Sequence, residues 1–220
     1  MILSHTRRFI YFKTVKTAGT TTEVLLEAAC LPRGDLPDKW EDWHQADEVV
    51  DDRGIVAARV HGAHTRFRHH MTPSELIDAL GPDVLSDYTT CANIRNPWDK
   101  MVSHFFFDAD REGRMPLKPD QIPGQLEAYL DGYRRWEIDR QIVSPDYRMD
   151  TFIRYEHLVD DISLFAQRCG FTIPDVAWPR LKSGSRPAAS RDYRPLYTRQ
   201  GQQAVAELYA DWIDAFGYRF

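Results

Sequence analysis

The chain has 220 residues, 43% of them hydrophobic, which suits a single globular domain over residues 1–220 with a substantial core. Its formal net charge of −5 argues against nucleic acid as a partner, because such binders present a broadly basic face. No run of about eighteen apolar residues is present, so we expect no transmembrane segment.

The first predicted element is an apolar strand over residues 8–12, after an N-terminus without the apolar stretch of a signal peptide. The strand leads into Lys16, Gly19 and several threonines, and a helical pattern follows over residues 21–30. Such a turn suits phosphate, because the first N–H groups of a helix lack partners within the helix and the helix dipole is positive there. The sequence therefore predicts a nucleotide-phosphate site in this turn.

The middle of the chain alternates between predicted strands and helices. Residues 31–54 read as a surface excursion, and a short strand follows over residues 55–60. A helix is predicted to begin at Thr72, where a proline and an acidic residue follow. The β-branched, apolar run over residues 88–94 predicts a central buried strand, and Asn96 begins the next helix.

The C-terminal half continues the alternation. A helix is expected over residues 125–141, a strand over 151–155 and a helix over 160–169 that a glycine closes. Residues 181–193 are basic and irregular, and residues 198–216 form an amphipathic helix. Strands that alternate with helices indicate an α/β fold, with a mostly parallel sheet flanked by helices on both faces.

A second candidate anion site follows the strand over residues 88–94. Arg95 comes directly after that strand, and Ser103 lies eight residues further along the expected helix. Ligands of α/β proteins gather at the carboxyl ends of strands, and a planar guanidinium suits phosphate. The ordinary alternatives are an ion pair of Arg95 with a surface acid and a plain helix-face hydroxyl at Ser103.

Taken together, the two motifs resemble the superfamily of sulfotransferases that use 3′-phosphoadenosine 5′-phosphosulfate (PAPS) as donor. Residues 16–21, Lys-Thr-Ala-Gly-Thr-Thr, resemble the family's 5′-phosphosulfate loop, and residues 95–103 resemble its 3′-phosphate motif. Residues 152–158 and 215–220 resemble further landmarks, so the resemblance covers nearly the whole chain. A Walker A loop is a poorer match, because its lysine ends the loop whereas Lys16 opens this one.

The resemblance implies a P-loop-NTPase-like fold, PAPS as the donor and no metal. Lys16 is then the catalytic cation, because an ammonium stabilises charge that develops on the leaving phosphate; the plain alternative is a solvated lysine. Lys13 could take either role. The donor-binding residues implied by the resemblance are Lys16, Thr17, Ala18, Gly19, Thr20 and Thr21 for the phosphosulfate, and Arg95, Ser103 and Arg186 or Lys182 for the 3′-phosphate or ribose. Gly19 is expected to let the backbone approach the ligand closely, and the loop around Arg186 could equally be a solvated one.

Sulfuryl transfer also needs a base for the acceptor hydroxyl, and histidine titrates in a suitable range. In 2-O-sulfotransferase-like enzymes a histidine-containing segment between the phosphate motifs supplies it. The segment that begins at His64 resembles it, which favours His64 over His61. The same stretch holds His69 and His70, but no zinc-binding cysteine or histidine pattern accompanies the histidines, so no metal is expected. The remaining candidates for the base are carboxylates: Glu23, Asp47 and Glu48.

The sequence thus predicts a PAPS-dependent sulfotransferase that acts on a hydroxyl of a carbohydrate or glycolipid. The alternatives are a P-loop-like nucleotide kinase, which would need Mg²⁺, and a non-catalytic nucleotide- or sugar-binding module. Eukaryotic relatives usually carry a Golgi membrane anchor, so the absence of an apolar segment favours a bacterial-type cytoplasmic enzyme. The three cysteines, Cys30, Cys91 and Cys169, are expected to be reduced structural thiols.

Overall fold

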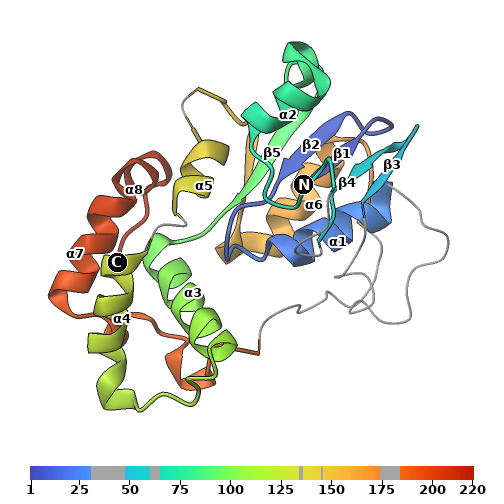
Figure 1. Cartoon of the computed structure of the whole chain (residues 1–220). Coiled ribbons are helices and arrows are strands. Elements are labelled where there is room, and N and C mark those ends of the chain that lie inside the picture. The colour runs from blue at the N-terminus through green and yellow to red at the C-terminus, as the bar shows by residue number, and fades with distance from the viewer. Residues whose placement is uncertain (31–47, 60–64, 134–135, 145, 174–183) are drawn as a thin grey trace. The chain divides into compact units, whose positions relative to one another are not determined.

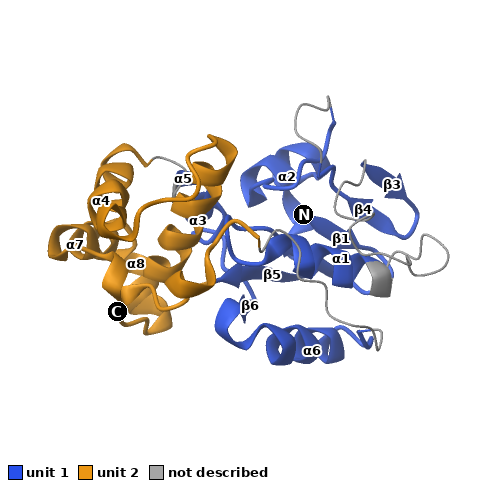
Figure 2. Cartoon of the chain, turned by 90° about the horizontal axis from the view of Figure 1, so that it is seen from below, with its two compact units in different colours: residues 1–94, 137–181 blue, residues 95–136, 182–220 orange. Residues whose placement is uncertain are grey.

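A computed structural model of the chain describes residues 1–30, 48–59, 65–133, 136–144, 146–173 and 184–220 (Figure 1). The chain falls into two compact units, which are described separately. Unit 1 comprises residues 1–94 and 137–181, and unit 2 comprises residues 95–136 and 182–220 (Figure 2).

Unit 1 is built on a six-stranded sheet in the order β3-β4-β1-β2-β5-β6. Strands β2, β5 and β6 are parallel, whereas β1 is antiparallel to β2 and β4, and β3 is antiparallel to β4. The expectation of a mostly parallel sheet was therefore wrong, because the sheet is mixed. The strands are β1 (Ile2–Ser4), β2 (Phe9–Phe12), β3 (Val49–Asp51), β4 (Gly54–Val56), β5 (Thr89–Ile94) and β6 (Thr151–Arg154).

The antiparallel half of the sheet arises from two tight connections. Residues 5–8 join β1 to β2, and two residues join β3 to β4, and connections this short link only antiparallel strands. Gly54 begins β4 with a φ of +154°, and a Cβ at this position would lie 2.1 Å from the carbonyl oxygen of Leu3. Glycine is thus required for β4 to pair with β1. Of the predicted strand over residues 55–60, only its first two residues belong to β4.

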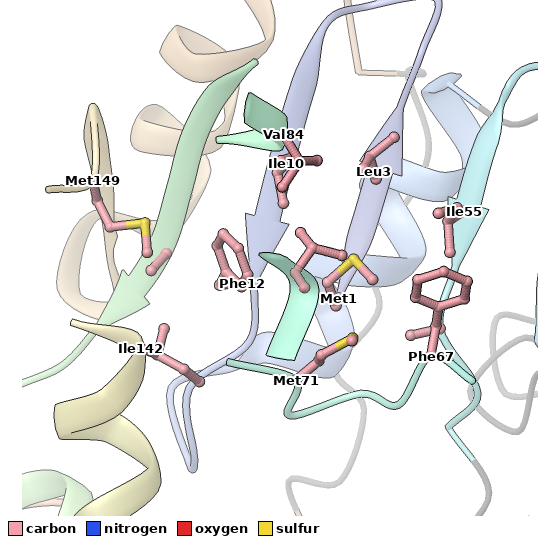
Figure 3. Packing of buried hydrophobic residues seen from close by; sticks show 13 residues of the cluster. Met1, Leu3, Ile10, Phe12, Ile55, Phe67, Met71, Val84, Ile142 and Met149 are labelled. Carbon is pink, nitrogen blue, oxygen red and sulfur yellow. The ribbon is translucent and has the colours of Figure 1, made fainter. Parts of the chain in front are cut away.

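Helices cover both faces of the sheet in unit 1, as predicted. Side chains alternate along β2, so Phe9 and Tyr11 pack in a cluster with α1 (Gly19–Cys30) and α6 (Leu158–Arg168). On the opposite face, Ile10 and Phe12 pack in a cluster with α2 (Pro73–Leu80) and α5 (Trp136–Ile142), which Figure 3 shows from close by. Figure 2 shows α2 and α6 on opposite sides of the strands. The turn over residues 13–18, which contains Lys16, therefore lies between a strand buried on both faces and a helix.

The ends of the unit 1 helices follow the sequence signals. Thr72 caps α2, and its side chain and that of Glu75 form a reciprocal capping box. The helix α6 ends just before Gly170, which has a left-handed φ of +71°. The single helix predicted over residues 125–141 is instead two helices, α4 (Ile122–Gly132) in unit 2 and α5.

Unit 2 is helical and consists mainly of α3 (Pro97–Arg111), α4, α7 (Arg199–Leu208) and α8 (Ala210–Phe216). Asn96 caps α3, because its side-chain oxygen accepts hydrogen bonds from the N–H groups of Trp98 and Asp99. The helix predicted over residues 198–216 is interrupted at Tyr209, where φ is −116° and ψ is 26°. The described residues also form short 3-10 helices: η2 (Pro82–Val84), η3 (Pro119–Gln121), η4 (Tyr155–His157), η5 (Ala188–Ser190) and η6 (Arg194–Leu196).

The C-terminal residues pack beside the start of α3. The ring of Phe220 lies 5.6 Å from that of Trp98, centroid to centroid, and contacts the rings of Tyr193 and Tyr197. The side-chain amide of Asn96 donates to the carbonyl oxygen of Arg219. The segment over residues 215–220, one of the sequence landmarks, thus supports the helix that follows Arg95 in the chain.

Two further sequence expectations concern membranes and cysteines. Among the described residues, no helix is both long and apolar enough to cross a bilayer. Cys91 is buried and Cys169 half-buried, and both are free thiols. Burial raises the pKa of both thiols, which agrees with structural rather than reactive cysteines.

Candidate functional site

Residues 13–18, hereafter the Lys16 loop, connect β2 to α1 through an unusual backbone. Lys16 has a φ of +59° and Ala18 a φ of +63°, which is uncommon for residues with a side chain. They alternate with Thr17 and Gly19, whose φ angles are not positive. Alternation of this kind turns successive N–H groups toward one side and forms a concavity for anions. The loop geometry thus suits an anion independently of the lysine side chain.

Buried side chains hold the Lys16 loop in this shape. The Thr14 hydroxyl donates to the carbonyl oxygen of Asn93 at 2.6 Å and lies 2.8 Å from the Thr17 hydroxyl, which donates to the carbonyl oxygen of Thr14 at 3.2 Å. The side-chain amide of Asn93 donates to the carbonyl oxygen of Thr17 at 2.8 Å. The carboxylate of Asp139 accepts a hydrogen bond from the N–H of Val15 at 2.8 Å. The Thr17 hydroxyl is therefore engaged inside the protein.

Gly19 and Lys13 fit together at the start of α1. A Cβ at Gly19 would lie 2.6 Å from Cγ of Lys13, so the packing of Lys13 requires glycine there, which differs from the predicted approach to a ligand. The Lys13 ammonium donates to the Thr20 hydroxyl at 3.0 Å and to Glu23 at 2.6 Å. Lys13 is thus buried and links the loop to α1 through Thr20 and Glu23, whereas Lys16 is only half-buried. Thr21 is buried in the first turn of α1.

Beneath the Lys16 loop lies a buried cluster of charges centred on Glu23. Its carboxylate contacts the Lys13 ammonium, the N-terminal ammonium at 2.5 Å and the Arg59 guanidinium at 3.3 Å. Arg59 also pairs with Glu27 at 2.5 Å. Burial raises the pKa of Glu23, but the three cations together outweigh it and hold this pKa far below its ordinary value. Glu23 is thus ionised and paired, which makes it a poor candidate for the base.

The histidine candidates are only partly described. His61 and His64 lie outside the described residues, as do Asp47 and Lys182. The carboxylate of Glu48 accepts a hydrogen bond from the N–H of Phe67. Among the described residues, no group of three or more histidine, cysteine, aspartate or glutamate side chains is arranged to hold a metal.

His69 and His70 lie within the described part of the same stretch. Nδ1 of His69 lies 3.2 Å from the carbonyl oxygen of Ala58, and Nδ1 of His70 lies 2.8 Å from that of Lys13. Burial, reinforced by the Lys13 ammonium, lowers the pKa of His69 to about 4 and that of His70 well below 6.5. Both rings are therefore neutral at pH 7.

The second candidate site, in unit 2, is organised by Asp99. One oxygen of Asp99 accepts from Nε and Nη2 of Arg95 at 2.8 and 2.6 Å, and the other accepts from Nη1 of Arg186 at 2.6 Å. Arg186 also donates to the carbonyl oxygens of Ser190 and Arg191. We call Arg95, Asp99 and Arg186 the Asp99 cluster. Two guanidinium groups share one carboxylate, so the cluster carries one net positive charge.

Ser103 lies on α3 one turn beyond Asp99, because residues four apart are neighbours on a helix surface. Its side chain is half-buried, and that of Arg95 is almost fully buried. Arg95 does form the ion pair with a nearby acid that was its ordinary alternative, and Arg186 joins the same acid. The structure thus brings Arg95 and Arg186 together within unit 2.

Several residues of these sites were missed from the sequence. Asn93 and Asp139 contact the Lys16 loop from 76 and 124 residues away, and no local pattern marks either of them. Asp99 follows Arg95 by four residues on a helix, a spacing that predicts an ion pair and could have been noticed.

Comparison with known proteins adds no relative: no family model, no curated protein and no solved structure matches this chain.

Proposed function

We propose that this chain is a PAPS-dependent sulfotransferase that acts on a hydroxyl of a carbohydrate or glycolipid. The observation that carries the proposal is the Lys16 loop, which joins β2 to the start of α1 and has left-handed φ angles at Lys16 and Ala18. An anion there would meet helix N–H groups, the positive end of a dipole and an ammonium. The resemblance of residues 16–21 and 95–103 to the sulfotransferase motifs supports PAPS over other phosphates.

In the proposed reaction the acceptor oxygen attacks the sulfur in line, and the bond from sulfur to the bridging oxygen breaks. Lys16 stabilises the negative charge that builds on the 5′-phosphate, and backbone N–H groups of residues 17–21 bind its other oxygens. The hydroxyls of Thr17 and Thr20 maintain the loop, because both are hydrogen-bonded within the protein.

We assign the 3′-phosphate to Arg95 and Ser103, with Arg186 as a second arginine. Asp99 holds both guanidinium groups in place, which lowers the entropy lost when they bind a phosphate. The net positive charge of the Asp99 cluster favours an anion. A base must also take the proton of the acceptor hydroxyl, and the resemblance offers His64 first and His61 second.

Calorimetric titration with adenosine 3′,5′-bisphosphate, AMP and ATP tests the donor. The bisphosphate is expected to bind without Mg²⁺ and more tightly than AMP, because hydrogen bonds to a charged phosphate contribute about 1.5–3 kcal/mol each. Equal affinity for the bisphosphate and AMP would contradict the proposed 3′-phosphate site. Tighter, Mg²⁺-dependent binding of ATP would instead favour the nucleotide kinase.

Transfer of radiolabelled sulfate from PAPS to a panel of glycans and glycolipids tests the reaction. Labelled product is expected with at least one acceptor and without added Mg²⁺. If the protein bound the bisphosphate tightly but transferred no sulfate from PAPS, it would be a nucleotide-binding module rather than an enzyme.

A further inference from the structure

We propose that Nε2 of His70 takes the proton of the acceptor hydroxyl, an inference that rests on the proposed sulfotransferase function and names its base. His70 lies in the same histidine-rich stretch, beyond the segment that resembles the family's histidine segment. Its ring is hydrogen-bonded through Nδ1 to the carbonyl oxygen of Lys13, the residue that opens the Lys16 loop. The ring thus stands directly against the loop that binds the phosphosulfate in the proposed function.

The hydrogen bond to Lys13 fixes the tautomer of the ring. A carbonyl oxygen only accepts hydrogen bonds, so Nδ1 of His70 carries the hydrogen at 2.8 Å from it. In a neutral imidazole the other nitrogen, Nε2, then holds a lone pair. Within the part of the chain that the structure describes, Nε2 has no hydrogen-bond partner, and the residue as a whole is half-buried. The protein therefore presents one nitrogen of His70 as a proton acceptor.

Burial and the neighbouring Lys13 ammonium keep the His70 ring neutral, as a proton acceptor must be. Among the described residues, the titratable groups that act on it are the Lys13 ammonium, the Glu23 carboxylate and the ring of His69, 4.5 Å away between centroids. Burial, followed by the Lys13 ammonium and His69, lowers the pKa of His70. The hydrogen bond to the Lys13 carbonyl and the Glu23 carboxylate have the opposite, smaller effect. A phosphosulfate in the Lys16 loop adds negative charge, which raises the pKa of a nearby imidazole. The proton affinity of Nε2 is then highest when the donor is bound, as a base requires.

The chemical step balances without another reactant. The acceptor oxygen forms a bond to sulfur while the bond from sulfur to the bridging oxygen breaks. The electron pair of the broken bond stays on the 5′-phosphate of the departing adenosine 3′,5′-bisphosphate. The proton of the acceptor hydroxyl moves to Nε2 of His70, and the resulting imidazolium releases it to water after the products leave.

The sharpest variant is His70→Asn, because an asparagine amide can keep the hydrogen bond to Lys13 while no atom replaces Nε2. His69→Asn is the matched control, since His69 is the adjacent residue, is also bonded through Nδ1 to a carbonyl and has a ring in contact with His70. Turnover is measured as release of adenosine 3′,5′-bisphosphate from PAPS, with a glycan acceptor or with water as the hydroxyl. His70→Asn should lower it by about 10²–10⁴-fold, whereas His69→Asn should change it by less than about threefold. Both should bind the bisphosphate as the unmodified protein does.

A second measurement does not depend on turnover. The His70 ring of the ¹⁵N-labelled protein is titrated by NMR with and without adenosine 3′,5′-bisphosphate. The neutral ring should carry its hydrogen on Nδ1, and its pKa should rise by about one unit or more when the bisphosphate binds.

The outcomes separate the base from the function. Normal turnover of His70→Asn with a large loss in His64→Ala or His61→Ala would transfer the role to that histidine. A hydrogen on Nε2, or a pKa that does not rise with the bisphosphate, would also overturn the role of His70. If the unmodified protein binds no bisphosphate, or binds it but releases none from PAPS, the proposed enzyme fails and the base with it.

Discussion

The Lys16 loop and the Asp99 cluster are both suited to an anion, but they are built differently. In the Lys16 loop, left-handed residues and a helix start turn backbone N–H groups to one side, and buried side chains hold that backbone. In the Asp99 cluster the positive groups are two arginine side chains, and a carboxylate keeps them in position. One site depends mainly on the backbone and the other on side chains.

This difference decides what a substitution can reveal. Backbone N–H groups remain when a side chain is replaced by that of any residue except proline, so such changes in the Lys16 loop should appear in stability or turnover more than in affinity. Substitution of either arginine of the Asp99 cluster removes part of the proposed binding site itself, so the affinity for the 3′-phosphate should fall directly.

The largest effect is expected for Glu23→Gln, which removes the charge beneath the Lys16 loop. Lys13, Arg59 and the N-terminal ammonium would lose their shared buried partner, and breaking a buried ion pair from one side costs about 3–5 kcal/mol. Urea unfolding followed by circular dichroism gives the free energy of unfolding.

Asp51→Asn is the control for Glu23→Gln, because Asp51 pairs with Arg53 at a partly exposed site. Such surface pairs contribute only about 0–1 kcal/mol. Equal losses of stability in the two variants would mean that the charge cluster does not support the loop.

Lys16→Ala should reduce turnover by about 10²–10³-fold, because the ammonium is most useful when the bridging oxygen becomes anionic. The affinity for adenosine 3′,5′-bisphosphate should change far less, since the backbone of the loop remains. Lys118→Ala, which removes an exposed lysine of unit 2, controls for net charge. An affinity loss as large as the turnover loss would make Lys16 a binding residue and weaken the contrast between the two sites.

Arg95→Ala should show the opposite pattern. Loss of a charge-assisted contact of about 1.5–3 kcal/mol should lower the affinity for the bisphosphate by roughly 10- to 150-fold. The affinity for AMP, which lacks the 3′-phosphate, should not change. Arg95→Lys keeps the charge but loses the planar fork, so an intermediate affinity is expected. Calorimetry with both nucleotides measures this, and a parallel loss for AMP would show that Arg95 does not read the 3′-phosphate.

The parts of the fold that the sequence predicted are those with a local pattern. The turn from β2 into α1, the buried strand β5 and the cap at Asn96 all follow from neighbouring residues. Strands β1, β3 and β4 have three residues each, too few to establish a period, and the mixed sheet depends on them. The same limit explains why a continuous helix was expected across Tyr209, where nothing in the sequence signals an end.

The candidate site divides in the same way. Lys16, Gly19 and Arg95 are candidates from the sequence because each lies in a short motif. The bonds that shape the Lys16 loop join it to Asn93 and Asp139, and His70 meets Lys13 across 57 residues of sequence. Such pairs are set by tertiary packing, so a single sequence carries no sign of them.

The smallest expected effect is that of Ser103→Ala. A neutral hydroxyl contributes about 0.5–1.5 kcal/mol through a hydrogen bond, so the bisphosphate should bind about two- to tenfold more weakly and AMP as before. Ser163→Ala is the control, because Ser163 is a helix serine of unit 1 whose hydroxyl is bonded to Val159. The combination with Arg95→Ala then sharpens the comparison. If both residues bind one phosphate, the double variant should lose less affinity than the two single losses added together. Strict additivity would place Ser103 outside the site, and the 3′-phosphate would then depend on the Asp99 cluster alone.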